Sequence, residues 1–148
     1  MPEVANPTRQ LIEEEEGRVP YVYPDSLGFD TIAVGHLVDK RKGGNLPNVI
    51  IDALLDWDIV SVRSFLVGMK GYSSLNAYQR ASIDSMAFQL GKHSFEAFTD
   101  FIGYIAKGDV KRAATCGRDS LWDHQTHSRA EREMKMLESG VWVPRDMK

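Results

Sequence analysis

A long segment with helical periodicity, residues 47–68, is the feature that most constrains the fold of this chain. Its apolar residues follow one stripe through Ile50, Leu54 and Trp57 and a second stripe that starts at Ile51. A helix that is apolar on several sides needs protein on several sides, because water would otherwise cover those side chains. The pattern therefore predicts one long helix that connects two lobes.

The segment before this helix has a different period. Residues 21–34 are rich in β-forming side chains and are interrupted at Pro24 and Gly28, which predicts a small antiparallel hairpin or a three-strand meander. Ahead of it, an Asn-Pro pair begins a short helix that is expected from 7 to 16. The charged, glycine-rich residues 39–46 predict a loop.

The segment after the long helix predicts a series of further helices. Ser128 has capping-box spacing to Glu131, and Thr126 is an equal candidate for the same cap. The expected helices run from 75 to 89, from a cap at Ser94 to 107, from a cap at Asp109 to 121, and from 126 or 128 to 140.

These elements predict an α+β fold that is mostly helical. A single domain, residues 1–148, would contain a small β-hairpin lobe at 7–46, the connecting helix at 47–68 and a helical C-terminal lobe at 69–148. Hydrophobic residues make up 43% of the chain, which is enough for a packed core. A cleft between two lobes is a common place for a ligand.

Charge and hydropathy exclude several classes of protein. The formal net charge is −3, and the one tight basic run, Lys40 to Lys42, lies in the predicted loop, so we expect no nucleic acid as a partner. No stretch reaches the roughly 18 apolar residues of a membrane span. Residues 1–17 lack the basic-then-apolar layout of a signal peptide, so we expect synthesis in a cytoplasm without export by the general secretory route.

The cysteine and histidine residues predict neither a disulfide nor a metal site. Cys116 is the single cysteine, so no disulfide can form within the chain, and its expected role is that of a small buried apolar residue. His124 and His127 are expected to be solvated near a helix start rather than to hold a metal ion. No cofactor is implied.

Two carboxylates, Glu16 and Asp25, are the candidate catalytic groups. Glu16 ends the first predicted helix after three other glutamates, and their repulsion at the negative end of the helix dipole indicates a role other than stability. Asp25 lies in the turn of the predicted hairpin, and Thr31 lies on its returning strand. Glycoside hydrolysis needs one carboxyl to protonate the leaving oxygen and a second for the anomeric carbon or its attacking water. Such pairs also arise by chance, so the surrounding residues have to decide.

The residues around these carboxylates resemble the N-terminal signature of the bacteriophage lysozymes of the T-even type. The matching residues are Glu16-Gly17, Tyr23-Pro24-Asp25, Gly28-Phe29-Asp30-Thr31-Ile32 and Gly35-His36-Leu37, in the family's order and spacing. Later in the chain they are Phe88-Gln89-Leu90-Gly91, Trp122-Asp123-His124-Gln125-Thr126, Ser128-Arg129-Ala130 and Gly140-Val141-Trp142. The resemblance covers nearly all of residues 8–143.

The resemblance implies a glycosidase that hydrolyses peptidoglycan and inverts the anomeric centre. Glu16 would be the general acid, with a pKa raised by burial, and Arg129 would pair with it and oppose that rise. Asp25 would stay ionised and position the attacking water together with Thr31. Inversion requires the two carboxyl groups to lie roughly 6.5–9.5 Å apart, which leaves room for that water.

Further side chains receive expected roles, most of them from the same resemblance. The saccharide groove would be lined by Gly35, Leu37, Phe88 and Gln89. His36 would pair with Asp58 on the long helix in a structural role, although a catalytic base is the alternative. The three tryptophans, at positions 57, 122 and 142, are expected in the core rather than stacked on sugars, because large aromatic residues at helical spacing are usually buried.

The chain also departs from the family pattern. Ala33 stands where a glycine is common, and residues 39–46 replace a longer run that carries its own helix. Cys116 and Leu121 stand where relatives carry polar residues, which affects the expected subsite for the peptide side of the substrate. None of these differences falls on the two carboxylates.

The functional hypothesis is an endolysin that cuts the β-1,4 bond between N-acetylmuramic acid and N-acetylglucosamine for host lysis. A lytic transglycosylase, for which Asp25 would be dispensable, and an inactive wall-binding protein are the alternatives. The protein would accumulate as a monomer in the host cytoplasm, without stable membrane association. It would reach the wall in the periplasm after a separate pore-forming holin opens the membrane.

Overall fold

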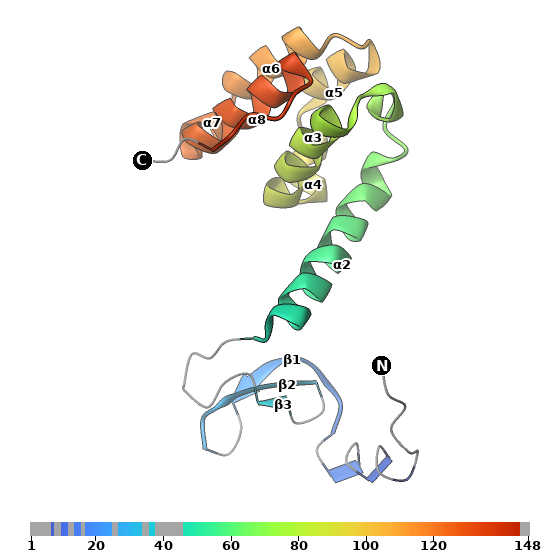
Figure 1. Cartoon of the computed structure of the whole chain (residues 1–148), viewed down its shortest axis with the longest axis vertical. Coiled ribbons are helices and arrows are strands. Elements are labelled where there is room, and N and C mark those ends of the chain that lie inside the picture. Colours follow the sequence, from blue (N-terminus) through green and yellow to red (C-terminus); the bar gives the residue numbers. More distant parts are fainter. Residues whose placement is uncertain are drawn as a thin grey trace. The chain divides into compact units, whose positions relative to one another are not determined.

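The computed structural model describes Pro7, Gln10, Leu11, Glu14, Glu15 and residues 17–24, 27–33, 36–37 and 46–145, with the backbone alone at His36. The backbone forms two compact units, residues 1–53 and 54–148, and the boundary between them falls within a helix. The predicted α+β, mostly helical class is confirmed, since a small antiparallel sheet is followed by a series of helices (Figure 1). The division into lobes at 7–46 and 69–148 stays a prediction.

The described elements have the following bounds in chain order. They are β1 (Val19–Pro24), β2 (Asp30–Ala33), β3 (His36–Leu37), α2 (Asn48–Leu66), the 3₁₀ helix η1 (Tyr72–Ser74), α3 (Ala77–Leu90), α4 (Lys92–Glu96), α5 (Thr99–Ala106), α6 (Val110–Arg118), α7 (Leu121–Gln125) and α8 (His127–Ser139).

The sheet is a three-strand meander in the order β1-β2-β3, which decides between the two arrangements predicted for this segment. Thr31 on β2 lies opposite Tyr23 on β1 and opposite Leu37 on β3. Ala33 ends β2 with a φ of 60°, and no other non-glycine residue in the described part of the chain has a positive φ. A side chain in the left-handed region costs roughly 1–2 kcal/mol, which explains why glycine suits this position.

The two helices that flank the sheet in the sequence are described to different extents. In the predicted helix from 7 to 16, the described residues Pro7, Gln10, Leu11, Glu14 and Glu15 are helical, and the ends lie outside the described residues. The predicted long helix is confirmed as α2, which begins and ends within two residues of the expected bounds. Across the described ranges, no helix is both long enough and apolar enough to cross a membrane.

The helix expected from Ser94 to 107 is wrong as a single element. It is divided into α4 and α5 at Phe98, whose φ and ψ of −79° and 60° are not helical. The division lets Phe95 and Phe101 both enter the core, where each is 1% exposed. Their rings pack edge to face, with 6.2 Å between the ring centroids. Ser94 is no cap, because α4 already begins at Lys92.

Two other helix ends also differ from the prediction. The cap at Asp109 is confirmed by its bond from the Arg112 amide, but α6 ends at Arg118 rather than near 121. Ser120 then caps the separate helix α7, because its hydroxyl accepts from the Asp123 amide at 3.3 Å. Of the two caps predicted for the last helix, Thr126 is the N-cap residue of α8, although its side chain makes no capping bond, and Ser128 is not a cap because α8 already begins at His127.

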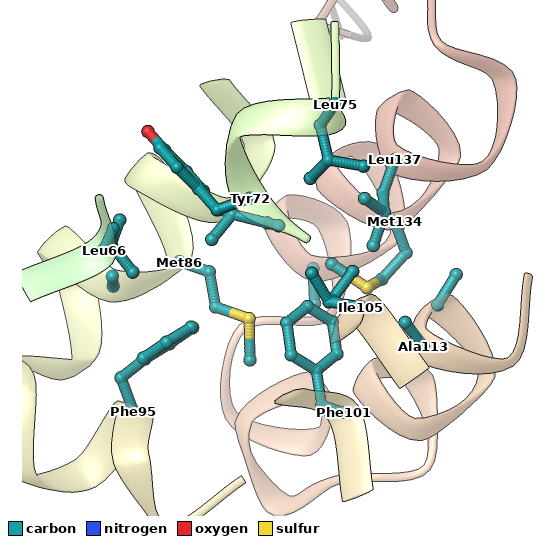
Figure 2. Packing of buried hydrophobic residues seen from close by; sticks show 14 of the residues in the cluster. Leu66, Tyr72, Leu75, Met86, Phe95, Phe101, Ile105, Ala113, Met134 and Leu137 are labelled. Carbon is teal, nitrogen blue, oxygen red and sulfur yellow. The ribbon is translucent and has the colours of Figure 1, made fainter. Parts of the chain in front are cut away.

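The core of residues 54–148 is one cluster of apolar side chains from the helices α3 to α8 and the end of α2. Met86 of α3, Ile105 of α5 and Met134 of α8 are fully buried, and Figure 2 shows Met86, Phe101 and Ile105 converging at its centre. Burying each such side chain stabilises the fold by roughly 1.5–3 kcal/mol. This cluster is therefore the main source of stability in this unit.

Polar bonds join the start of α3 to the end of α8. Asn76 and Gln79 form a reciprocal capping box at the start of α3, a signal that the sequence interpretation missed. The same two side chains donate to the end of α8, Asn76 to the Gly140 carbonyl at 2.8 Å and Gln79 to the Leu137 carbonyl at 3.1 Å. Each amide thus satisfies backbone groups of two helices.

The expectation of three core tryptophans holds for one of them. Trp122 is 3% exposed, whereas Trp57 is 71% and Trp142 is 57% exposed, so the prediction is wrong for those two. The Arg132 guanidinium lies 4.8 Å from the centre of the Trp142 ring and donates to the Val143 carbonyl. This contact fastens the chain after α8 without burying the indole.

We expect Gly71→Ala to destabilise the protein more than Gly108→Ala. Both glycines have a positive φ, 89° and 73°, so both substitutions carry the left-handed cost of roughly 1–2 kcal/mol. A Cβ at Gly71 would also overlap the Ile105 carbonyl, whereas nothing lies within 4 Å at Gly108. The overlap adds roughly 1–3 kcal/mol, measurable as a lower urea midpoint. Equal midpoints for the two variants would contradict this account.

Candidate active-site residues

The three predicted catalytic residues are described only in part. Glu16 and Asp25 lie outside the described residues. Thr31 is buried on β2 at 5% exposure, and its hydroxyl donates to the Phe29 carbonyl at 3.2 Å. This bond uses the hydroxyl hydrogen, so the lone pairs of Thr31 Oγ1 remain to accept a hydrogen bond.

The residues predicted to lie near the two carboxylates are also described only in part. Gly35 and the side chain of His36 lie outside the described residues, so the pair of His36 with Asp58 stays a prediction. Leu37 is 40% exposed on β3. Asp58 lies on the exposed surface of α2.

The structure brings two of the predicted residues, Asp58 and Phe88, to one groove within residues 54–148. This groove has a volume of about 630 Å³, and its further lining includes Phe65, Gly91 and Lys92. Phe88 stands near the end of α3 at 44% exposure, which is high for so large an apolar side chain. An exposed aromatic ring in a concave surface is typical of a ligand contact.

Gln89, the next residue, has a fixed amide orientation. The Trp122 indole donates to Gln89 Oε1 at 2.9 Å, and an indole N–H can only donate. The Gln89 amide must therefore present its oxygen to Trp122, which leaves its NH₂ group to donate to another acceptor. The sequence pointed to both residues separately but gave no sign of the bond between them.

Arg129 has its described partners within residues 54–148, the helical unit of the chain. Its Nε donates to Glu133 Oε1 at 2.9 Å, and its Nη2 donates to the Ser85 hydroxyl at 2.9 Å and carbonyl at 3.1 Å. The Ser85 hydroxyl in turn donates to Glu133. The predicted pairing of Arg129 with Glu16 falls outside the described residues and stays a prediction.

Glu133 is a buried carboxylate that the sequence interpretation missed. It is 6% exposed, and its Oε2 has no hydrogen-bond partner among the described residues. Burial raises the pKa of Glu133 above its ordinary value, and the bonds from Ser85 and Arg129 offset part of that rise. Its position between the buried Ala130 and Leu137 at helical spacing was the available signal.

A second acidic residue, Asp123, is buried in α7. Its Oδ1 lies 2.8 Å from His127 Nδ1, and this bond raises the pKa of the exposed His127. Asp123 Oδ2 is buried without a partner in the described part of the chain. Within the same described ranges, no three His, Cys, Asp or Glu side chains gather where they could share a metal ion.

The two departures near the expected peptide-side subsite have different surroundings. Cys116 is half-buried and packs against the core, and burial raises the pKa of its thiol. Leu121 is 71% exposed at the start of α7. Cys116 is thus close to the expected role of a small apolar residue, whereas Leu121 presents an apolar surface to solvent.

A small antiparallel sheet with a helical unit defines a lysozyme-like α+β protein, and sequence comparison identifies its family. Residues 13–138 match the family described as phage lysozyme, so the chain belongs to the phage lysozyme family. This membership supports a peptidoglycan hydrolase of the lysozyme type.

Individual relatives are more distant. The chain is 25% identical to the pre-baseplate central spike protein Gp5 of Enterobacteria phage T4, over 88% of this chain and 27% of the length of that protein. It is 23% identical to the probable T4-type lysozymes 1 and 2 of Dictyostelium discoideum, over 90% of this chain and 94% of each of them. The chain therefore spans a small part of the spike protein but most of the two lysozymes.

The raised pKa of Glu133 predicts a stability that depends on pH. The folded state binds this proton more tightly than the unfolded state, so the contribution is complete below the ordinary carboxyl pKa of 4.5 and is lost as pH rises through the folded value. We expect the unfolding free energy of the parent, minus that of Glu133→Gln, to increase as pH is lowered from 7 to 4.

Glu138→Gln is the matched control, with the opposite sign. A bond from Arg118 at 2.8 Å lowers the pKa of Glu138, so its contribution is present above 4.5 and is lost as pH falls through the folded value. The same difference should decrease with falling pH for this variant. Parallel trends for both variants in urea titrations would refute the assignment.

Proposed function

We propose that this protein hydrolyses the β-1,4 bond between N-acetylmuramic acid and N-acetylglucosamine in peptidoglycan, with inversion of the anomeric centre. The observation that carries the proposal is the family match over residues 13–138, which spans Glu16, Asp25 and Thr31. The names of the Dictyostelium relatives, probable T4-type lysozymes, agree with this activity. The likeness to a phage protein favours a phage origin of the chain.

In the proposed reaction, Glu16 protonates the leaving glycosidic oxygen and Asp25 activates a water on the opposite face of the sugar. Thr31 assists Asp25 by accepting a hydrogen bond from that water. Its buried hydroxyl suits this role, because the bond to the Phe29 carbonyl fixes the direction of its lone pairs. No metal or cofactor takes part in these steps.

Substrate binding is proposed to use Phe88 and Gln89 together with Gly35 and Leu37. In this proposal the exposed Phe88 ring stacks against a sugar ring, because the negative face of an aromatic ring attracts the C–H groups of the sugar. The Gln89 NH₂ group would donate to a carbonyl oxygen of the glycan, since Trp122 already holds the amide oxygen. Trp122 would then act on the substrate only through the orientation of Gln89.

We expect Glu16→Gln and Asp25→Asn to abolish most of the activity on purified peptidoglycan. Each change keeps the shape of the side chain and removes the ionisable group, so the rate of reducing-sugar release should fall roughly 10²–10⁴-fold. Glu14→Gln is the control, because Glu14 is exposed, bonds only to Gln10 among the described residues and has no proposed role.

Other outcomes separate the alternative functions. Anhydro-sugar products with an active Asp25→Asn variant would identify a lytic transglycosylase instead. Wall binding by a parent that releases no sugar would identify a binding protein. Either result would overturn the proposed hydrolysis.

The proposed setting is host lysis, with the protein held in the host cytoplasm until a holin opens the membrane. We expect cells that express the protein alone to stay intact and to lyse within minutes when chloroform permeabilises the membrane. Glu16→Gln expressed to the same level should not cause lysis under either condition. Spontaneous lysis without permeabilisation would refute the requirement for a holin.

A further inference from the structure

The segment that follows α8, residues 140–143, carries an exposed tryptophan that no proposed catalytic or binding step uses. We call this segment the strap. Trp142 is 57% exposed, and the neighbouring Val141 is 55% exposed. Neither residue lines the groove that contains Phe88, and neither lines a second groove, of about 520 Å³, that contains Arg80. The strap is therefore a surface separate from both grooves.

The backbone is fixed on both sides of Trp142. The Gly140 carbonyl accepts from the Asn76 side chain at 2.8 Å, and the Val143 carbonyl accepts from Arg132 Nε at 2.7 Å. Gly140 also turns the chain with a φ of 69°, and a Cβ at this position would lie 2.8 Å from the Asn76 amide nitrogen. The strap is thus held at both ends, so its indole has a defined place on the surface.

The orientation of the indole ring is fixed as well. The Arg132 guanidinium lies over the Trp142 ring, with its Cζ atom 4.8 Å from the ring centroid. A cation is attracted to the negative face of an aromatic ring, so this contact holds the ring and covers one of its faces. The exposed area then lies on the opposite face and at the ring edges. Trp142 is a rigid aromatic platform that is open to solvent.

Arg132 has hydrogen-bond donors beside this platform. Its Nε atom serves the Val143 carbonyl, and its terminal nitrogens make no hydrogen bond to a described residue. A guanidinium carries five N–H donors, so most of them remain for a ligand. The charge of Arg132 also offsets part of the rise in the pKa of Glu133, the next residue on α8. The strap thus places an aromatic face next to a group that can only donate.

We propose that the strap is a second, non-catalytic binding site for the glycan strand, with one sugar ring against Trp142 and the acetamide carbonyl of a neighbouring sugar bonded to Arg132. The choice of ligand rests on the proposed function, since N-acetyl sugars form the polymer that such an enzyme cuts. The C–H groups of a sugar are attracted to an aromatic face, and a carbonyl oxygen accepts from a guanidinium. A second contact keeps the protein on an insoluble polymer between cuts.

Other ligands use less of this surface. Inorganic phosphate would bond to Arg132 but would leave the indole without a partner. A stable protein interface buries about 800 Å² on each side, whereas the strap offers only two exposed apolar side chains, Val141 and Trp142. An anionic membrane would meet a single guanidinium here on a chain of net charge −3, which gives weak adsorption. A glycan uses both the ring and the donors.

The three tryptophans allow the site to be tested by NMR, because each gives one indole N–H signal. The Trp122 N–H donates to Gln89 and reports on the glycan contact proposed there, Trp142 reports on the strap, and the exposed Trp57 of α2 is the internal control. The probe is the β-1,4-linked tetrasaccharide of N-acetylglucosamine, added to the full chain with Glu16→Gln. We expect a saturable shift of the Trp142 signal, with a midpoint different from that of Trp122 and no shift of Trp57.

Arg132→Met should weaken binding at Trp142 at least about tenfold, because it removes the donors and the cation that holds the ring. Arg112→Met is the matched control. Arg112 also lies over an aromatic ring, that of Tyr104 at 5.9 Å, but outside the strap, so its loss should leave the Trp142 midpoint unchanged. The response of the Trp122 signal should be the same in both variants.

Trp142→Ala tests the consequence for the reaction. In the otherwise unchanged chain, we expect the KM for insoluble peptidoglycan to rise several-fold while kcat stays the same, because the strap touches no reacting atom. Rates on short soluble glycan fragments should match those of the parent. Trp57→Ala, which removes another exposed indole, should behave as the parent on both substrates.

Several results would overturn the proposal. They are no saturable shift at Trp142, equal effects of Arg132→Met and Arg112→Met, or a larger Trp142 shift with inorganic phosphate or phosphatidylglycerol vesicles than with the tetrasaccharide. The titration measures binding alone, so it does not depend on the roles of Glu16 and Asp25. Binding at Trp142 by a chain whose parent releases no reducing sugar would refute the hydrolase and leave the strap site standing.

Discussion

The packing of α3 against α8 is the contact on which the rest of the helical unit depends. Met86 of α3 and Met134 of α8 are both fully buried in the same cluster. At one end of the contact, Asn76 and Gln79 bond to the last carbonyls of α8. Because α3 is fixed along its length, its far end presents Phe88 and Gln89 at a defined position.

Residues 54–148 contain two buried carboxylates, which cost stability. Glu133 and Asp123 are each largely removed from water, and each has one oxygen without a partner among the described residues. A well-packed apolar side chain would be cheaper at either position. The charges instead fix the guanidinium of Arg129 and the ring of His127, so stability is given up for orientation at the start of α8.

Helix α2 serves two grooves with different chemistry. Asp58 and Phe65 belong to the groove that contains Phe88, whereas Arg63 and Val67 belong to the groove that contains Arg80. The helical rotation of about 100° per residue places these two sets on different faces of one helix. One helix therefore lines two separate grooves with different residues.

The sequence by itself determined the element types, the long helix, the cap at Asp109 and the resemblance around Glu16 and Asp25, because these depend on local spacing. It did not determine the break at Phe98, the separate helix α7 or the burial of Glu133. Those features depend on which side chains meet across the core: Phe95 with Phe101, Trp122 with Gln89, and Arg129 with Glu133. Only the tertiary structure decides such partners, since the free energy of burying a group depends on neighbours that are distant in the sequence or on another turn of a helix.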